Sequence, residues 1–471
     1  MDAVIDFLNT LFWGYVLIYG LLAVGVYCTL RLGFLQFIHF PEFFRVIRGS
    51  RGVDRAGISP FQALTVSLAS RVGTGNLAGV AVALYLGGPG AIFWMWMVAL
   101  VGMATAYSES TLAQLYKVTD DTGQYRGGPA FYIAKGLKAP WAGVIFSVCL
   151  ILSFGLVFNA VQANSIAEAM EGAFSIPKLV TGLVLAVLAG IIIFGGLRKI
   201  AAVAELVVPF MAIGYLLLAL YVVVTHITLV PGVIAHIIGS AFGLQEAAGG
   251  VTGGVAAAML NGVKRGLFSN EAGMGSAPNI AACATPDPHH PSSQGFVQAL
   301  GVFIDTLVIC TCTAIMILLS GALEPGSGTT GMQLTQVALT EHFGFLGKYF
   351  VAIAIFFFAF TSIIGNYSYA ENAIIYIGHG HIAGLTVLRV VALAMVVWGA
   401  LQSVATVFNT ADASMGLMAT INLIAIVLLS GTVVKLTRDY FAQRKAGSEP
   451  VFHAADYPEL GDDIDHAIWK R

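Results

Sequence analysis

Apolar residues along this chain are gathered into long runs separated by short polar segments. Eleven runs are predicted to be membrane-spanning helices, because each approaches the ~20 apolar residues that cross a bilayer. They cover residues 11–32, 61–84, 89–116, 141–170, 179–196, 201–225, 250–284, 296–321, 346–376, 383–405 and 409–437. The pattern lacks the alternating ~10-residue strands of a transmembrane barrel. We therefore predict an all-α polytopic membrane protein with eleven transmembrane helices.

Composition agrees with this class and narrows the function. Of the 471 residues, 58% are hydrophobic and 10% are charged, whereas soluble domains carry about 25% charged residues. The net charge of −2 and the lack of a basic arm give no indication of a nucleic-acid partner. Five cysteines, an odd number, argue against a disulfide framework. The N-terminal stretch carries acids instead of the basic region of a signal peptide, so we expect it to be retained.

The distribution of basic residues predicts the orientation in the membrane. They gather at Arg31, Arg45, Arg48, Arg51 and Arg55 after the first run, at Lys117, Arg126, Lys135 and Lys138 after the third, at Arg198 and Lys199 after the fifth, and at Lys435, Arg438, Arg444 and Lys445 at the last. Segment 226–249 contains no Lys or Arg. Positively charged loops stay in the cytoplasm. We expect an inner (plasma) membrane protein with its N-terminus outside and its C-terminus in the cytoplasm.

Two of the runs are interrupted by glycine and polar residues at matching places. Gly73-Thr74-Gly75-Asn76 lies in the second run, and Gly273-Met274-Gly275-Ser276 lies 200 positions later in the seventh. The two runs cross the membrane in opposite directions, and five runs follow from each start. We therefore predict a 5+5 inverted repeat with two discontinuous helices, plus one peripheral helix at the N-terminus.

This repeat divides the chain into five parts. They are a peripheral helix with a basic cytoplasmic segment (1–60), a first five-helix repeat (61–225), an extracellular loop (226–249), a second five-helix repeat (250–437) and a cytoplasmic tail (438–471). The polar, acidic end of the tail, from Ala446 onward, is expected to be mobile. The segment 322–345 is expected outside, with a short surface helix.

A helix break inside a membrane needs a physical reason. Unpaired backbone groups in lipid cost several kcal/mol each, so a break persists only where protein, ligand or water satisfies it. Half-helix N-termini suit a carboxylate, and freed carbonyls suit a cation. The alternative is that the glycines only let helices pack closely. Two breaks at corresponding places, both beside charged residues, favour a binding site for a small charged solute.

The broken segments carry a resemblance to a known family. The stretches "SRVGTGNLAGVA" (70–81), "RGLFSNEAGMGSAP" (265–278), "GGPAFYI" (127–133) and "FAFTSIIGNYSYAEN" (358–372) are similar to those of the alanine/glycine:cation symporters of bacteria and archaea. The resemblance spans nearly the whole chain. It implies the inverted-repeat fold of the neurotransmitter:sodium symporters. It also implies sodium-coupled uptake of small neutral amino acids, chiefly alanine or glycine, with sodium as the co-transported ion.

The resemblance also implies a place for sodium. In that fold the ion lies between carbonyls of the first broken helix and hydroxyls of the ninth span. Matched onto this sequence, the carbonyls are those of Ala69 and Val72, and the hydroxyls are those of Thr361 and Ser362. The alternative is that both hydroxyls bond only to carbonyls of the preceding helical turn.

The amino acid is expected between the two breaks. Its carboxylate should meet the N–H groups at the start of the second half-helix, and its ammonium should meet carbonyls or an amide of the seventh span. The candidate residues are Thr74, Gly75, Asn76, Gln162, Phe268, Ser269, Asn270, Gly273 and Asn366. For Gln162 and Asn366 the alternative is an interhelical hydrogen bond, worth about 1 kcal/mol, without a ligand.

One residue departs from the family pattern. Alanine-type members often have a bulky tryptophan where this chain has Asn366. A smaller, polar side chain would widen the pocket and offer an amide partner. Glutamine and serine therefore stay open as substrates beside alanine and glycine.

Several charged residues fall inside the predicted spans. They are Arg71, Glu109, Glu205, Lys264, Arg265, Glu271, Asp305 and Glu371. Such residues usually face the bundle interior and mark a pathway or an ion pair, and mutual pairing is expected here. Arg71 and Glu271 adjoin the breaks, so gating and a structural salt bridge are both open. Glu205, near Arg198 and Lys199, is expected to be structural.

Other functions remain as alternatives. A channel could use exposed carbonyls, and a symporter could couple to protons through a carboxylate. An intramembrane enzyme is disfavoured because no nucleophile–base pair or metal-ligand set appears at useful spacing, and ATP-driven transport because no P-loop is present. The chain is thus expected to be a transporter without enzymatic activity. A monomer is the starting hypothesis, although the sequence does not fix the oligomeric state.

Overall fold

The structure is a computed structural model that describes residues 2–48, 54–243, 253–324, 326–378 and 382–470. Within them, eight helical stretches are long and apolar enough to cross a membrane. They are Ala3–Arg31, Gly90–Leu115, Pro140–Phe174, Gly196–Thr225, Pro291–Ser320, Gly331–Gly378, Ile382–Leu401 and Val404–Leu428. The prediction of a helical, multi-pass membrane protein is confirmed. Predicted runs 61–84 and 250–284 are missing from this set because breaks divide them, and 179–196 matches a shorter apolar helix.

The helical elements of the first half follow one another closely. In chain order they are α1 (Asp2–Leu11), η1 (Phe12–Val16), α2 (Leu17–Arg31), α3 (Leu35–Ile38), α4 (Phe40–Ile47), α5 (Pro60–Arg71), η2 (Gly75–Gly79), α6 (Val80–Gly87), α7 (Gly90–Leu115), α8 (Pro129–Gly136), α9 (Pro140–Leu150), η3 (Ile151–Val157), α10 (Phe158–Phe174), α11 (Lys178–Ile193), α12 (Gly196–Thr225) and α13 (Val230–Ala241). A two-stranded antiparallel hairpin, β1 (Val118–Thr119) with β2 (Tyr125–Arg126), follows α7.

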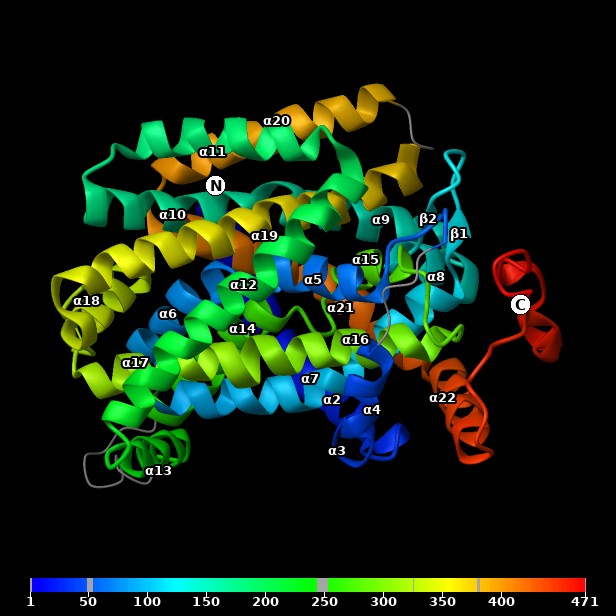
Figure 1. The fold of residues 1–471 in the computed structure, drawn as a ribbon, viewed down its shortest axis with the longest axis horizontal. Coiled ribbons are helices and arrows are strands. Elements are labelled where there is room, and N and C mark those ends of the chain that lie inside the picture. Colours follow the sequence, from blue (N-terminus) through cyan, green and yellow to red (C-terminus); the bar gives the residue numbers. More distant parts are fainter. Residues whose placement is uncertain (1, 49–53, 244–252, 325, 379–381, 471) are drawn as a thin grey trace.

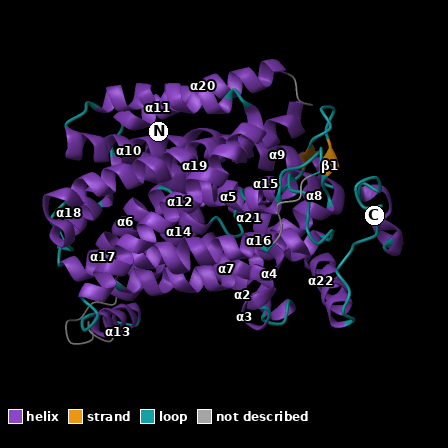
Figure 2. Cartoon of the chain, viewed as in Figure 1, coloured by secondary structure: helices purple, strands orange, loops and turns teal. Residues whose placement is uncertain are grey.

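The second half continues in the same manner. Its elements are α14 (Gly253–Asn270), α15 (Pro278–Ala282), α16 (Pro291–Val302), η4 (Phe303–Cys310), α17 (Thr311–Ser320), α18 (Gly331–Phe343), η5 (Gly344–Leu346), α19 (Gly347–Gly378), α20 (Ile382–Leu401), α21 (Val404–Leu428), α22 (Ser430–Lys445), η6 (Ala454–Asp456) and η7 (Pro458–Asp463). Figure 2 shows how completely helix dominates the described chain.

The long helices run roughly along the longest axis of the molecule, as Figure 1 shows for α7, α10, α11, α16, α19 and α20. Helix α7 packs against α14 and α16, while α10 packs against α19 and α20. At one end lie α13 and α18; at the other lie the hairpin, α22 and the C-terminus (Figure 1). These peripheral elements thus lie at the two ends of a helix bundle.

The outer surface of the bundle is apolar. On α12, Leu206 is 76% exposed and Phe210 is 81% exposed, and many Leu, Val and Ile side chains on α11 and α20 are also exposed. A protein in water rarely exposes such a continuous apolar surface. These helices therefore face lipid.

Both predicted interruptions are present. Helix α5 begins at a capping box in which Ser59 and Gln62 bond to each other's backbone, and it ends at Arg71 before the chain turns into η2. Helix α14 ends at Asn270, and α15 starts at Pro278. In this second break Gly273 and Gly275 have φ of +83° and +85°, a left-handed conformation that glycine adopts without strain.

The two segments that were predicted to be extracellular contain more helix than expected. Segment 226–249 contains α13, while its residues 244–249 lie outside the described part. The helix predicted within 322–345 exists as α18. The prediction that this helix lies at the surface is wrong. Leu334, Thr335 and Ala338 are buried because one face of α18 packs against α19 and η2.

Two expectations at the C-terminal end are also wrong. The predicted last span, 409–437, combines two helices, since α21 ends at Leu428 and α22 continues separately. The tail was expected to be mobile, but it folds against the body. Trp469 is fully buried, and its indole Nε1 donates to the Leu115 carbonyl at 3.3 Å. Two aromatic side chains, Phe452 and Trp469, anchor the otherwise polar segment.

Candidate functional site

The two helix breaks contact each other at the centre of the bundle. A Cβ atom at Gly75 would lie 3.1 Å from the Ser269 Cα atom. A Cβ at Gly73 would lie 2.2 Å from the Ser362 Oγ atom on α19. No side chain fits at these two positions without displacing its neighbours. The glycines therefore allow three elements, the first break, the end of α14 and α19, to meet closely.

Asn76 connects the first break to the second half of the chain. Its Oδ1 atom accepts a hydrogen bond from the Gly73 N–H at 2.9 Å, which closes the turn. Its Nδ2 atom donates to Asp305 Oδ1 at 2.7 Å and to Ser269 Oγ at 3.2 Å. One side chain thus stabilises the break and joins α14 and η4.

Asp305 completes a group of buried oxygen atoms. Its Oδ2 atom accepts hydrogen bonds from Ser269 Oγ at 2.9 Å and from Thr306 Oγ1 at 2.6 Å. The carboxyl group is fully buried, and among the described residues no basic side chain lies within ion-pair distance. A buried carboxylate without a basic partner, surrounded by hydroxyls, can bind a hard cation such as Na⁺ or hold a proton.

Asp305 was not among the predicted site residues, because the sequence pattern placed it only among the buried charges. One feature of the sequence could have indicated a site role for Asp305. It is a carboxylate within an apolar run, and ionisable residues inside membrane spans usually have a function. The structure adds that η4 is a π-helical segment. Such segments often occur at functional sites.

Gln162 reaches the N–H groups where the second half-helix starts. Its Oε1 atom accepts a hydrogen bond from the Thr74 N–H at 2.9 Å. The Thr74 hydroxyl oxygen is buried and has no hydrogen-bond partner. An N–H and an unpartnered hydroxyl at a half-helix N-terminus are groups that a carboxylate would satisfy.

The residues expected around sodium lie only partly together. Ser362 Oγ donates to the Ala69 carbonyl at 2.7 Å and to the Phe358 carbonyl at 3.0 Å. Thr361 Oγ1 donates to the Phe358 carbonyl at 2.9 Å and lies 3.8 Å from the Met211 sulfur on α12. Ser362 therefore faces the first break, whereas Thr361 is directed towards α12. Val72 adjoins this point as the residue that directly follows α5.

Asn366 belongs to a polar chain across three elements. Ser70 Oγ lies 2.5 Å from Asn366 Oδ1 and 2.6 Å from Glu271 Oε1. Asn366 Nδ2 donates to Asn159 Oδ1 on α10 at 3.1 Å. Because a hydroxyl has one proton, Ser70 can donate to only one of its two acceptors at a time. This chain joins Asn366 to the carboxyl group of the second break.

The second break is held by a carboxylate from α7. Glu109 accepts from the Gly273 and Gly275 N–H groups, each at 3.2 Å. Asn422 on α21 donates to Glu109 Oε2 at 2.7 Å and to the Gly273 carbonyl at 2.9 Å. These contacts satisfy backbone groups that the break leaves free. Glu109 therefore positions the break, a role that its place in the sequence did not indicate.

The remaining candidates of the seventh span lie beside this break. Phe268 stacks on Phe158 of α10, with ring centroids 4.7 Å apart. Asn270 accepts from the Ala272 N–H at 3.0 Å, and its Nδ2 atom is buried without a partner. An unsatisfied buried amide is costly, and a ligand carbonyl or carboxylate would satisfy it.

The expected mutual pairing of the eight buried charges is wrong. Among the described residues, no ion pair joins two of them; Lys264 and Arg265 both pair with Asp412 on α21. Glu205 accepts from Gln62 at 2.8 Å at the start of α5, in line with a structural role. The partners are spread over other helices, which spacing along the chain does not reveal.

Arg71 lies between the site and α16. Its Nη1 atom donates to the Gln298 carbonyl at 3.1 Å, while Nε and Nη2 have no hydrogen-bond partner although the side chain is buried. No carboxylate lies within ion-pair distance of it among the described residues. The salt bridge considered for Arg71 and Glu271 is therefore not formed in this conformation.

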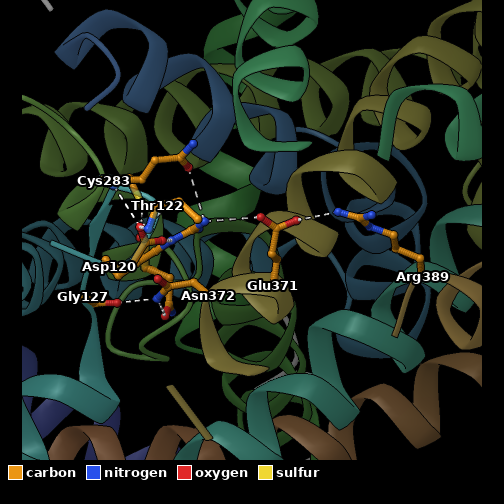
Figure 3. Close-up of polar contacts among 10 residues, drawn as sticks. Asp120, Thr122, Gly127, Cys283, Glu371, Asn372 and Arg389 are labelled. Carbon is orange, nitrogen blue, oxygen red and sulfur yellow. Dashed lines mark hydrogen bonds and ion pairs between the residues drawn. The ribbon is translucent and has the colours of Figure 1, made fainter. Parts of the chain in front are cut away.

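Glu371 is at the centre of a network at the hairpin end of α19. It lies 3.6 Å from Arg126 Nη2 and 3.9 Å from Arg389 Nη2. Figure 3 shows Glu371 between Arg389 and a group that includes Asp120 and Asn372. Asn372 donates to the Gly127 carbonyl and to Asn279, so α19 is tied to the segment that follows β2 and to α15. This network closes the bundle at that end.

Comparison with known proteins shows the family to which the chain belongs. The family model of the sodium:alanine symporter family matches residues 1–454. The amino-acid carrier protein AlsT of Bacillus subtilis is 50% identical over 459 residues, covering 98% of this chain and 96% of its own. A second protein of the same organism, named "Probable sodium/glutamine symporter GlnT", is 48% identical and covers 96% and 93%. The sodium/alanine symporter AgcS of Methanococcus maripaludis is 39% identical and covers 94% and 98%.

The match extends over both helix breaks and over the helices that hold them. It confirms the resemblance carried by the broken segments. A helical bundle with an apolar outer surface and a buried polar centre is the architecture that membrane transport of a polar solute requires. The chain therefore belongs to the sodium:alanine symporter family, whose members are sodium-coupled amino-acid transporters of the membrane and not enzymes.

Proposed function

We propose that this protein carries a small neutral amino acid, with alanine and glycine as the first candidates, into the cell together with sodium. The observation that carries the proposal is the meeting of the two helix breaks around Asn76, Ser269 and Asp305. Apolar contacts alone could hold the helices of this bundle together, so folding does not require a polar centre. It supplies oxygen ligands, the N–H groups at the start of a half-helix and a negative charge at one buried place.

Sodium is assigned to two positions beside the first break. At one, the ion would be coordinated by the Ala69 and Val72 carbonyls and the Ser362 hydroxyl. Supporting this, Ser362 Oγ already lies 2.7 Å from the Ala69 carbonyl. Thr361 lies next to Ser362 in the chain, and its hydroxyl faces Met211. At the other, the Asp305 carboxylate would coordinate the ion together with neighbouring hydroxyls. Carboxylate, carbonyl and hydroxyl oxygens are the hard ligands that such a cation prefers.

The amino acid is assigned to the space between the breaks. Its carboxylate would take the Thr74, Gly75 and Asn76 N–H groups and displace Gln162 from the hydrogen bond that it now accepts. Its ammonium would take the carbonyls near Phe268 and Ser269 or the second lone pair of Asn270 Oδ1, which already accepts from the Ala272 N–H. The Gly273 carbonyl, held by Asn422, completes the polar lining.

We assign to Asn366 a role in limiting the size of the substrate. Its amide lies within hydrogen-bond distance of Ser70 and Asn159, and no bulky ring fills this position. A substrate with its own side-chain amide could replace one of these partners. Glutamine is therefore the second candidate substrate, and it is also the substrate that the name of the GlnT relative states.

Transport would follow alternating access between two inverted five-helix halves, as in the neurotransmitter:sodium symporters. The repeat supports this, since both halves begin with a broken helix. The basic loops support an orientation in the plasma membrane with the hairpin end in the cytoplasm and the α13–α18 end outside. One sodium entering across 100 mV releases about 2.3 kcal/mol, enough to concentrate a neutral solute several tens of fold.

The proposal is tested by uptake of labelled L-alanine into proteoliposomes. Uptake with an inward sodium gradient is compared with uptake in potassium, and ten unlabelled amino acids are added in turn as competitors. We expect sodium-dependent accumulation that alanine or glycine blocks. Blocking mainly by glutamine would keep the mechanism and assign the wider pocket to Asn366.

Two further outcomes would overturn parts of the proposal. Uptake that depends on a pH gradient and does not depend on sodium would indicate that the coupling ion is a proton bound to a buried carboxylate. Flux without saturation, and without stimulation by amino acid on the opposite side, would indicate a channel. A monomer is the assumed working unit, and light scattering of the purified protein checks it.

A further inference from the structure

A cavity of about 560 Å³ lies between the N-terminal helices and α22, away from the transport site. The turn after α2 forms one wall with Arg31 and Leu32, His39 contributes from the approach to α4, and α22 forms the opposite wall. Helix α22 contributes Arg438, Phe441 and Lys445. His39 stacks on Phe441 with ring centroids 3.8 Å apart, which fixes the floor between the two walls.

The cavity is lined by cations that have no carboxylate partner. Among the described residues, none of the ion pairs involves Arg31, Arg438 or Lys445, and no acidic side chain lines the cavity. Neighbouring basic residues, by contrast, have carboxylate partners. Arg45 and Arg444 pair with Glu42. Lys435 pairs with Glu459. Three uncompensated positive charges around one cavity repel each other and favour an anion between them.

The cavity is also placed at a membrane boundary. Arg31 is the last residue of α2, the end of the apolar stretch Ala3–Arg31. Leu30 next to it is 59% exposed, and Phe37 and Ile38 on α3 are 54% and 63% exposed. Apolar side chains exposed beside a basic cluster are typical of a segment that lies in the headgroup region of a bilayer. A soluble anion would need no such apolar border.

We propose that this cavity binds the phosphate headgroup of an anionic glycerophospholipid. The guanidinium groups of Arg31 and Arg438 can each donate two parallel hydrogen bonds to phosphate oxygens. Lys445 adds a third charge, and the apolar lining formed by Leu30, Leu32 and Phe441 lies where the glycerol and the first acyl carbons would be. The proposal is independent of which amino acid the protein carries.

The test is a lipid titration of the purified full chain, followed by native mass spectrometry. Dioleoyl phosphatidylglycerol is the probe, phosphatidylcholine is its neutral counterpart, and inorganic phosphate is the soluble anion. The test variant is R31Q/R438Q/K445Q. The matched control K138Q/R198Q/K199Q removes the same number of charges outside the cavity. The variant R31K/R438K keeps the charge and loses the guanidinium geometry.

We expect one phosphatidylglycerol to bind tightly to the wild-type chain. A cation near a membrane surface contributes about fivefold to affinity, so the triple variant should bind on the order of a hundredfold more weakly. The control should stay within about twofold, and R31K/R438K should lie between them. Sodium-driven alanine uptake by each variant in neutral vesicles checks that the fold is intact.

Three outcomes would overturn the proposal. Equal weakening in R31Q/R438Q/K445Q and in the control would indicate general charge attraction. If phosphatidylcholine binds as tightly as phosphatidylglycerol, the cavity does not select for the net negative charge of the lipid. Inorganic phosphate competing at equal concentration would make the cavity a site for a soluble anion and not for a lipid.

Discussion

The side-chain amide of Asn76 donates a hydrogen bond to the Asp305 carboxylate over 2.7 Å, although 229 positions separate the two residues. Asn76 belongs to the first helix break, and Asp305 lies in the helix that follows the second. The same amide also reaches Ser269 at the end of α14. These bonds therefore tie the first break directly to α14 and η4.

Asp305→Asn should weaken the response to sodium. The substitution keeps the shape of the side chain and removes the negative charge that attracts the ion. We expect the sodium concentration for half-maximal alanine uptake to rise at least about tenfold, which corresponds to about 1.4 kcal/mol. The matched control is Glu205→Gln, a carboxylate bonded to Gln62 at a helix start. An unchanged sodium dependence in Asp305→Asn would exclude the carboxylate as a ligand.

Ser362→Ala and Thr361→Ala should differ, although the two residues are adjacent. Ser362 faces the Ala69 carbonyl, whereas Thr361 faces Met211. Ser362→Ala removes a proposed sodium ligand and should raise the half-maximal sodium concentration several-fold, and Thr361→Ala should change it less than about twofold. Uptake measured over a series of sodium concentrations decides this. Equal effects would mean that both hydroxyls act, or that neither does.

Asn366→Trp should narrow the pocket. A ring at this buried position would occupy the space beside Ser70 and Asn159. Competition by glutamine against labelled alanine should fall at least about tenfold, while competition by glycine should be retained. Asn366→Ala is the companion variant, because it removes the amide without filling the space. If glutamine competes equally well against all three proteins, Asn366 does not set substrate size.

Lys117→Met should change the pH dependence of stability. Lys117 lies just beyond α7, and burial lowers its pKa to about 7 from the ordinary value of 10.5. Between these values the unfolded chain binds one more proton than the folded chain, so stability rises with pH. From pH 7 to pH 9 the gain is roughly 2 kcal/mol. Melting temperatures of the two proteins across this range provide the measurement, and parallel curves would contradict the assignment.

The sequence predicted a helical, multi-pass membrane protein and both breaks, for a physical reason. Membrane spans need about 20 apolar residues, and glycine with polar neighbours inside such a run leaves few other interpretations. The positions of Gly73 and Gly273 were therefore visible from local pattern alone. The family also followed from these local stretches, and the comparisons confirm it.

The pairings across the bundle were not predictable in this way. Glu109 reaches the second break from α7, and Lys264 and Arg265 reach Asp412 on α21. Each contact depends on which helix faces meet, and this is decided by packing over the whole chain. Likewise, α18 was expected at the surface because its sequence is mixed, but its burial depends on the neighbouring η2 and α19.

The packed C-terminal segment has a practical consequence for anyone who shortens or labels the protein. The family match stops at residue 454, whereas the anchor Trp469 lies beyond it. A chain cut where the match stops would leave the Leu115 carbonyl without its indole partner and would expose the Lys117 side chain, which the Trp469 ring now covers. A label attached close to Trp469 would disturb the same contacts.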